Sequence, residues 1–213
     1  MSSFNNGDFE YGNTVGWTIG GGRRTAFSSF EILPQDYLPG GLYYNSTIAD
    51  SHSQIVGSNN DSLLNTLMPN IVQKGQYAFR VEDLNTGGYA SVISQQINNY
   101  FCLDIYFAWL AVLQNGNHTS NESSVMIVEL NDTTNGDRLL FRRYDAGANS
   151  SGIDSRFQQS GLYFYTPSWQ TEHLTIMNNR IGHNFTLTVL AADCKPAGHR
   201  GYVYLDSFSG VAP

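Results

Sequence analysis

The sequence predicts an all-β protein, a single jelly-roll β-sandwich over residues 1–213 with a long decorated loop region near its N-terminus. The first observation is composition: 13% of the 213 residues are aromatic and only 14% are charged, which excludes a disordered chain. The second is pattern, because short runs with strand-like alternation recur between turns rich in Gly and Asn. Regularly spaced short strands are typical of β-sandwiches.

The N-terminal third has a different character. From about residue 20 to residue 74 the chain is loop-rich, with Pro34 and a polar run over 51–61. Because a structureless loop of this length is uncommon in a compact domain, we expect short strands or one small helix there. The range 62–72 is a candidate for a short helix, which Pro69 would limit.

The clearest strand is predicted over 101–113. Its odd-numbered positions are all apolar and are expected to face the main core: Phe101, Leu103, Ile105, Phe107, Trp109, Ala111 and Leu113. Its even-numbered positions are mixed, which indicates a central strand with one face partly solvated. Further strands are predicted at Tyr77–Asp83, Ala90–Gln96, Val125–Leu130, Arg138–Tyr144, Gly161–Thr166, Glu172–Met177, Phe185–Ala192 and Gly201–Phe208. Asn135-Gly136 between two of these runs predicts a hairpin.

The charge pattern argues against two classes of partner. Eleven Lys and Arg residues stand against 18 acids, a net charge of −7, and the basic residues are scattered. Nucleic-acid binding normally needs a basic stripe, so we expect none. The longest apolar run, 100–113, contains Asp104 and is too short to cross a bilayer, so we expect no membrane insertion.

Location and cysteine state are less constrained. Seven Asn-x-Ser/Thr sequons, together with scarce lysine, favour a secreted or cell-surface protein. No signal peptide is visible, so the chain is expected to be either a mature form with a start Met or a cytosolic protein. Cys102 and Cys194 form either one disulfide or two buried free thiols. The oligomeric state is left open.

The two ends of the chain carry a family resemblance. Asn6–Gly12, followed by Gly16-Trp17, resembles the opening of galactose-binding-like jelly-roll modules, and 201–208 resembles their closing strand. These modules include several families of carbohydrate-binding modules and domains of extracellular and surface adhesion proteins. The resemblance implies that the first and last strands pair and that a structural Ca²⁺ lies where the two ends meet.

The acids at the two ends match this implied calcium site. Glu10 and Asp206 correspond to the family pattern, and Asp8 is a further candidate ligand. Carboxylate oxygens suit Ca²⁺, and two neighbouring carboxylates repel unless a cation or a proton compensates them. The alternative is that the acids are solvated or paired with arginine.

The mixed strand faces supply candidate ligand-binding residues. A jelly-roll face can present aromatic rings that stack on sugars beside polar groups that bind hydroxyls. The candidates are Arg80, Glu82, Asp104, Tyr106, Arg142, Tyr202 and Tyr204, with Trp169 on a loop or edge. For any single aromatic, a core or plain surface position is the competing interpretation.

The predicted function is a non-catalytic module that binds a glycan or cell-surface polymer. The alternatives are an adhesion or protein-interaction module without sugar specificity, and a glycan-active hydrolase or lyase.

A second group of residues is His118, Glu122, Asp193 and His199. They would form a transition-metal or catalytic site if the loops after the 101–113 and 185–192 strands are neighbours.

The sequence contains no Gly-x-Ser-x-Gly, His-Glu-x-x-His or phosphate-binding motif, and Gly20-Gly21-Gly22 is followed by arginine. We therefore predict that the protein is not an enzyme.

Overall fold

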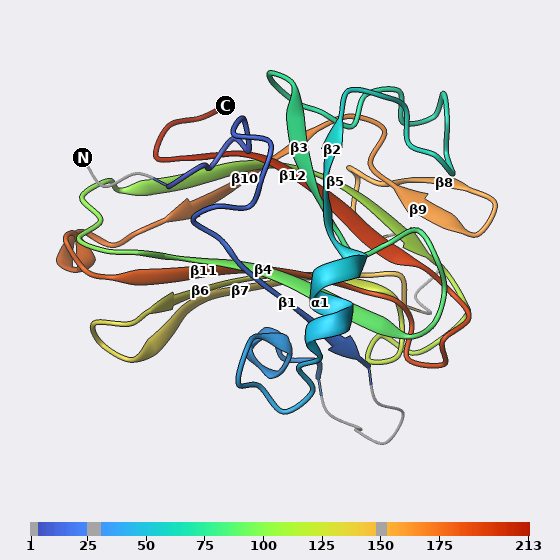
Figure 1. Cartoon of the computed structure of the whole chain (residues 1–213), viewed down its shortest axis with the longest axis horizontal. Helices are drawn as coiled ribbons and strands as arrows, with labels where there is room; N and C mark the ends of the chain where they lie inside the picture. Colours follow the sequence, from blue (N-terminus) through green and yellow to red (C-terminus); the bar gives the residue numbers. More distant parts are fainter. Residues whose placement is uncertain (1–3, 25–30, 148–152) are drawn as a thin grey trace.

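The computed structural model describes residues 4–24, 31–147 and 153–213, and it confirms the all-β fold (Figure 1). In this part of the chain, two antiparallel sheets lie face to face as a sandwich. The five-stranded sheet, called the small sheet, has the order β1 (Thr18–Arg23), β4 (Tyr89–Ile97), β11 (Phe185–Ala192), β6 (Val125–Asp132) and β7 (Asp137–Asp145). The seven-stranded large sheet has the order β2 (Gln54–Gly57), β3 (Tyr77–Val81), β12 (Gly201–Ser209), β5 (Asp104–Gln114), β9 (Tyr163–Tyr165) and β8 (Gln158–Ser160), and β10 (Gln170–Thr175) also pairs with β5. Short helices lie in the connections: η1 (Pro34–Tyr37), α1 (Ser46–His52) and η2 (Asn178–Arg180).

The strands predicted from the sequence are present, and β11 has the predicted bounds. The predicted hairpin joins β6 to β7, with Gly136 at a φ of 73° that glycine adopts readily. The short strand β2 lies in the region where short strands were expected, although its position was not predicted, whereas β8 and β1, which contains the glycine run, were missed. Glycine is needed in β1 because a Cβ at Gly22 would lie 1.9 Å from the carbonyl oxygen of Tyr43. The run therefore serves close packing of the segment that covers β1.

The main core lies between the sheets and is built on β5. Its inward residues Ile105, Phe107 and Trp109 are fully buried, as the alternation predicted. The prediction is wrong for Phe101 and Leu103, which are 65% and 44% exposed. The reason is that β5 begins only at Asp104, so these two residues belong to the connection from β4 and lie outside the alternation of the strand.

Loop segments cover parts of both outer faces. Residues 31–53, which include η1 and α1, pack on the outer face of the small sheet around Tyr37. Residues 58–76 pack on the large sheet through Leu64, Met68 and Ile71. The prediction of one small helix in the N-terminal third is confirmed by α1, whose N-cap Asn45 accepts a hydrogen bond from the Ile48 amide. The helix proposed at 62–72 is wrong, because that range is turns folded around Asp61.

The structure decides between the two alternatives for the cysteines, and it shows that the implied pairing of the first and last strands is wrong. The cysteines are free, since Cys102 lies before the start of β5 while Cys194 lies near the β12 residue that pairs with Leu113 at the other end. The 11 residues of β5 span roughly 35 Å, whereas bridged Cα atoms lie within about 7 Å. The first and last strands do not pair either, because β1 pairs with β4 and β12 with β3 and β5. The chain ends still meet through the Phe208 amide, which donates to the Gly7 carbonyl at 2.9 Å.

Over the described residues, the helices are all too short and too polar to cross a membrane.

Candidate functional site

Part of the outer face of the large sheet is not covered by the 58–76 segment. Two predicted ligand residues, Asp104 and Tyr106, lie there on β5, and His173 of β10 lies directly opposite Tyr106. The Tyr106 and His173 rings are stacked, with centroids 4.4 Å apart and planes 9° apart. Asp104 Oδ1 lies 2.6 Å from His173 Nε2, which fixes the orientation of the imidazole. The side chains of His173 and Asp104 are 48% and 35% exposed, so this pair is open to a ligand.

The same face continues along β10 toward the edge of the sheet. Thr171 and Thr175 are exposed and alternate with the buried Glu172 and Leu174. At the end of the row, the indole of Trp169 donates to the Asn70 carbonyl at 3.0 Å and is half-buried against the covering segment. We call this surface the β10 face; its residues are Asp104, Tyr106, Trp169, Thr171, His173 and Thr175.

The sequence interpretation missed the β10 contribution to this face. Thr171, His173 and Thr175 were not nominated, although the run Thr171–Thr175 alternates polar and apolar residues as a half-exposed strand does. That alternation was the available signal. Its partner β5 was harder to interpret, because both faces of that strand are buried over most of its length.

Tyr202 and Tyr204 are core residues, so the prediction that they present rings to a sugar is wrong. Both are at most 1% exposed, beneath the covering segment 58–76. Their hydroxyls donate to Asp61 at 2.9 Å and 2.7 Å. Burial raises the pKa of both hydroxyls well above the usual tyrosine range. Alternation identified the outer face of β12 but could not show that a distant loop covers it.

Arg80, Glu82 and Arg142 are also held by internal partners. Arg80 is 9% exposed and its Nε donates to the Glu82 carbonyl at 2.9 Å. Glu82 is fully buried, so the prediction that it contacts a ligand on an open face is wrong. Arg142 forms an ion pair with Glu172 across the gap between the two sheets. Among these three, Arg142 alone keeps substantial exposure, at 38% of its side chain.

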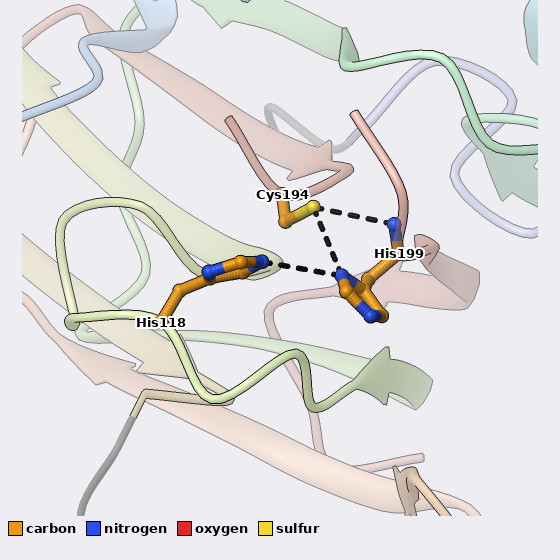
Figure 2. A group of neighbouring side chains, drawn as sticks. All are labelled: His118, Cys194 and His199. Carbon is orange, nitrogen blue, oxygen red and sulfur yellow. Dashed lines mark hydrogen bonds between the residues drawn. The ribbon is translucent and has the colours of Figure 1, made fainter. Parts of the chain in front are cut away.

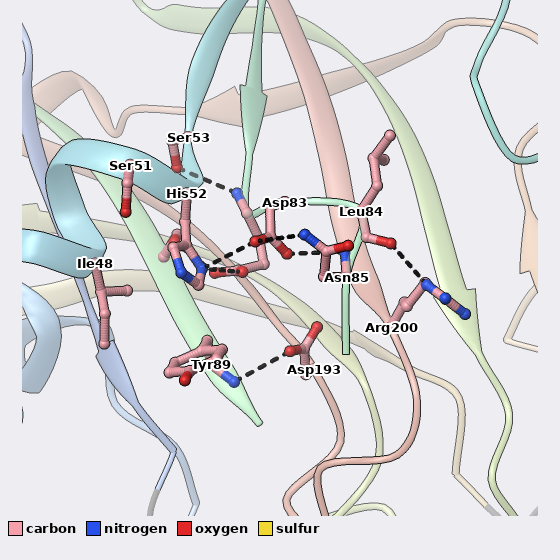
Figure 3. Close-up of polar contacts among 12 residues, drawn as sticks. Ile48, Ser51, His52, Ser53, Asp83, Leu84, Asn85, Tyr89, Asp193 and Arg200 are labelled. Carbon is pink, nitrogen blue, oxygen red and sulfur yellow. Dashed lines mark hydrogen bonds and ion pairs between the residues drawn. The ribbon is translucent and has the colours of Figure 1, made fainter. Parts of the chain in front are cut away.

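Glu82 contacts His52 at the end of α1, in an acidic cluster whose members His52, Asp83 and Asp193 are labelled in Figure 3. His52 Nδ1 lies 2.6 Å from Glu82 and 3.6 Å from Asp83, and the Glu82 contact raises the pKa of His52. Asp193 lies nearby and accepts backbone hydrogen bonds from Gly88, Tyr89 and Gly201. Burial, reinforced by the charge of Glu82, raises the pKa of Asp193 to about 8. These contacts join α1, β3, β4 and the end of β11, so the cluster holds the fold together at this point.

The acids from the two ends of the chain, Glu10 and Asp206, accept hydrogen bonds from one backbone loop. Glu10 accepts the amides of Gln76 and Tyr77, both at 2.9 Å. Asp206 accepts those of Gln73 and Lys74 at 3.0 and 3.1 Å, and its burial raises its pKa to about 6. The loop amides therefore compensate both carboxylates.

Asp8 and Glu10 line a cavity of about 600 Å³ that Lys74 and Ser207 also line. Among the described residues, Asp8, Glu10 and Asp206 do not form a group whose oxygens are close enough to share one ion. Backbone amides of the loop over residues 73–77 lie where the calcium prediction placed a cation. The calcium ion stays a prediction.

The second predicted group is partly assembled beyond the end of β5 at Gln114, away from the end at Asp104 (Figure 2). His118 Nε2 lies 3.2 Å from His199 Nδ1, as expected if the two loops are neighbours. The remaining two acids do not join them. Asp193 is buried among the backbone amides named above, and Glu122 accepts a hydrogen bond from Thr119. Cys194 takes the third position, with its Sγ 3.4 Å from His199 Nδ1.

Comparison with known proteins adds information about the fold. No protein-family model matches the sequence, and no curated protein matches it. Among solved structures, TmCBM61 in complex with beta-1,4-galactotriose superposes with a TM-score of 0.52 at 10% identity, covering 98% of this chain and 97% of that chain. A cyclase from Fischerella sp. TAU gives 0.48 at 11% identity over 98% and 96% of the two chains. The module CBM27-1 from Caldicellulosiruptor saccharolyticus, in complex with mannohexaose, gives 0.47 at 10% identity over 97% of each chain. The superposition on TmCBM61 shows that the chain shares a β-sandwich fold with that module, in agreement with the fold class predicted from the sequence.

Proposed function

We propose that the protein is a non-catalytic carbohydrate-binding module that binds a glycan on the β10 face. The observation that carries the proposal is the exposed Tyr106–His173 stack with Asp104 bonded to the imidazole. The similarity in fold to TmCBM61, which was solved with beta-1,4-galactotriose, supports the same class of ligand.

The chemistry of the β10 face suits a sugar. An aromatic ring provides a flat apolar surface for the C–H groups of a pyranose ring. The Asp104 carboxylate accepts hydrogen bonds from hydroxyls, and the exposed hydroxyls of Thr171 and Thr175 both donate and accept. Because Asp104 already orients His173, the imidazole loses little freedom when a ligand binds.

The proposal includes an extracellular location. Six of the seven sequon asparagines lie in the described residues, and all six reach the surface: Asn45, Asn60, Asn117, Asn121, Asn131 and Asn184. Asn149, the seventh, lies outside the described residues. Glycosylation at such positions requires surface exposure, which these six provide.

Glycan binding is expected to be lost when the stack is removed. Glycan-array binding identifies the ligand, and titration calorimetry then measures its Kd. Tyr106→Ala and His173→Ala are each expected to weaken binding at least about tenfold, which corresponds to about 1.4 kcal/mol. Tyr11→Ala is the matched control, because Tyr11 is an aromatic residue that is 67% exposed elsewhere on the surface. Absence of any bound glycan, or an unchanged Kd in both stack variants, would contradict the proposal.

The calcium prediction is tested by thermal unfolding. It requires EDTA to lower the Tm and Ca²⁺ to restore it. An ion at 100 times its Kd stabilises the fold by about 2.7 kcal/mol, or about 5–10 °C for a chain of this size. Glu10→Ala should abolish the response, whereas Asp50→Ala, which changes an exposed acid on α1, should keep it. A melting curve of the unaltered protein that EDTA leaves unchanged would show that no such ion is bound.

A further inference from the structure

Three side chains from two loops point at one another beyond the far end of β5 (Figure 2). His118 comes from the connection between β5 and β6, and Cys194 and His199 come from the connection between β11 and β12. One ligand atom from each of these residues lies within 4.8 Å of the other two. A thiol and two imidazoles are the donor types that proteins use for Zn²⁺.

The distances between these donor atoms match a tetrahedral ion. Two nitrogens at about 2.0–2.1 Å from such an ion lie about 3.3 Å apart, and a nitrogen and a sulfur at about 2.3 Å lie about 3.6 Å apart. The observed separations are 3.2 Å for His118 Nε2 to His199 Nδ1 and 3.4 Å for Cys194 Sγ to His199 Nδ1. These two separations therefore differ from the tetrahedral values by only a few tenths of an ångström, and the third pair, His118 Nε2 and Cys194 Sγ, lies within 4.8 Å.

The loops are held in place by contacts that do not involve the three donors. The Lys195 amide donates to the Glu122 carbonyl at 2.7 Å, which joins the two loops. Arg24 donates to the carbonyls of Asn121, Ser123 and Asp193, which lie in both loops. A rigid surrounding of this kind lowers the cost of bringing ligands together.

The backbone around the three side chains contacts the sulfur and leaves room beside the imidazole rings. The His199 backbone amide donates to Cys194 Sγ at 3.2 Å, a contact that orients the sulfur toward the two rings. Gly116 leaves room beside the rings, because a Cβ there would lie 2.3 Å from His199 Nδ1 and 2.6 Å from His118 Nε2.

We propose that His118, Cys194 and His199 bind a single Zn²⁺ ion, with a water molecule in the fourth position. Both histidines are half-buried and Cys194 is fully buried, so the ion is reached from the solvent side of the rings. The site is separate from the β10 face, because His118 and His199 lie beyond the end of β5 while Asp104 and Tyr106 lie at its start. It binds zinc whether or not the protein binds a glycan.

Titration calorimetry of chelator-treated protein with Zn²⁺ tests the site. We expect one ion per chain, and an affinity at least about 100-fold weaker in Cys194→Ser and in His199→Ala. Cys102→Ser is the matched control, because it removes the other free cysteine and should leave the affinity unchanged. Absence of stoichiometric binding, or full affinity in Cys194→Ser, would overturn the proposal.

Cobalt substitution identifies the sulfur ligand even if Cys194→Ser does not fold. Co²⁺ bound to a thiolate gives a charge-transfer absorption band in the near ultraviolet, and tetrahedral Co²⁺ gives intense visible bands. Both should appear in the Cys102→Ser variant, whose single remaining cysteine is Cys194. A Co²⁺ complex without the thiolate band in this variant would rule out the proposed ligand set.

Discussion

Asp61→Ala is expected to lower the free energy of unfolding by about 3–5 kcal/mol. Asp61 is fully buried and accepts hydrogen bonds from the hydroxyls of Tyr202 and Tyr204 and from the amides of Leu63 and Leu64. Alanine leaves all these donors without an acceptor beneath the covering segment 58–76. Each unsatisfied buried donor costs about 1–3 kcal/mol, partly offset because a buried anion is also removed. Urea unfolding monitored by circular dichroism measures the change.

A triple variant separates lost hydrogen bonds from lost packing. Tyr202→Phe and Tyr204→Phe remove the hydroxyls that Asp61 accepts, so combining them with Asp61→Ala should recover part of the stability. Replacing both partners of a buried hydrogen bond costs much less than removing one. In a mutant cycle of unfolding free energies, the triple variant is therefore expected to lose much less stability than the sum of the losses from Asp61→Ala and from the two tyrosine substitutions. A loss below about 1 kcal/mol in Asp61→Ala alone would show that the loop is not anchored there.

Arg24→Ala is expected to cost at least about 3 kcal/mol of unfolding free energy. The guanidinium is 5% exposed and donates to the carbonyls of Ser123 and Asp193, both at 2.6 Å, and of Asn121 at 2.7 Å. Burial lowers the pKa of Arg24 to about 10, so the group stays charged at neutral pH. Hydrogen bonds to a charged group contribute about 1.5–3 kcal/mol each. The same unfolding experiment measures the loss.

The preceding residue supplies the control for Arg24. Arg23 is exposed, and Arg23→Ala should change stability by less than about 0.5 kcal/mol. The two substitutions remove the same charge from adjacent positions, so any difference reports the buried contacts. Equal effects from both would contradict the assignment of Arg24 as the residue that joins the two loops.

The strand pattern was predictable because alternation along a strand has a purely local cause. Successive side chains point to opposite faces, so the apolar positions of β5 identify the inner face without knowledge of the rest of the chain. The prediction failed at Phe101 and Leu103 because the strand begins at Asp104, three residues later than predicted, and apolar character alone does not mark that boundary.

The candidate sites were less predictable because they depend on contacts between distant segments. Asp104 and Tyr106 were nominated from one strand, but their partner His173 is 67 residues beyond Tyr106 and meets it through the register of β5 and β10. His118 and His199 were linked on the condition that two loops are neighbours, which the structure confirms. Cys194 rather than Asp193 faces them, because Asp193 turns inward to accept three backbone amides at the end of β11.

The sequence by itself determined the all-β class, the strands that form the core and the resemblance of both ends to galactose-binding-like jelly-roll modules. These features depend on composition, on a period of two residues and on short motifs, all of which are local. Only the tertiary structure decided which outward faces are open, since segments 31–53 and 58–76 cover sheet regions far from them in sequence. The 58–76 segment covers one part of the outer face of the large sheet and buries Tyr202 and Tyr204 there, whereas the uncovered part of the same face is the β10 face. Whether a side chain is buried depends on how the whole chain packs, so the alternation of residues within one strand does not determine it.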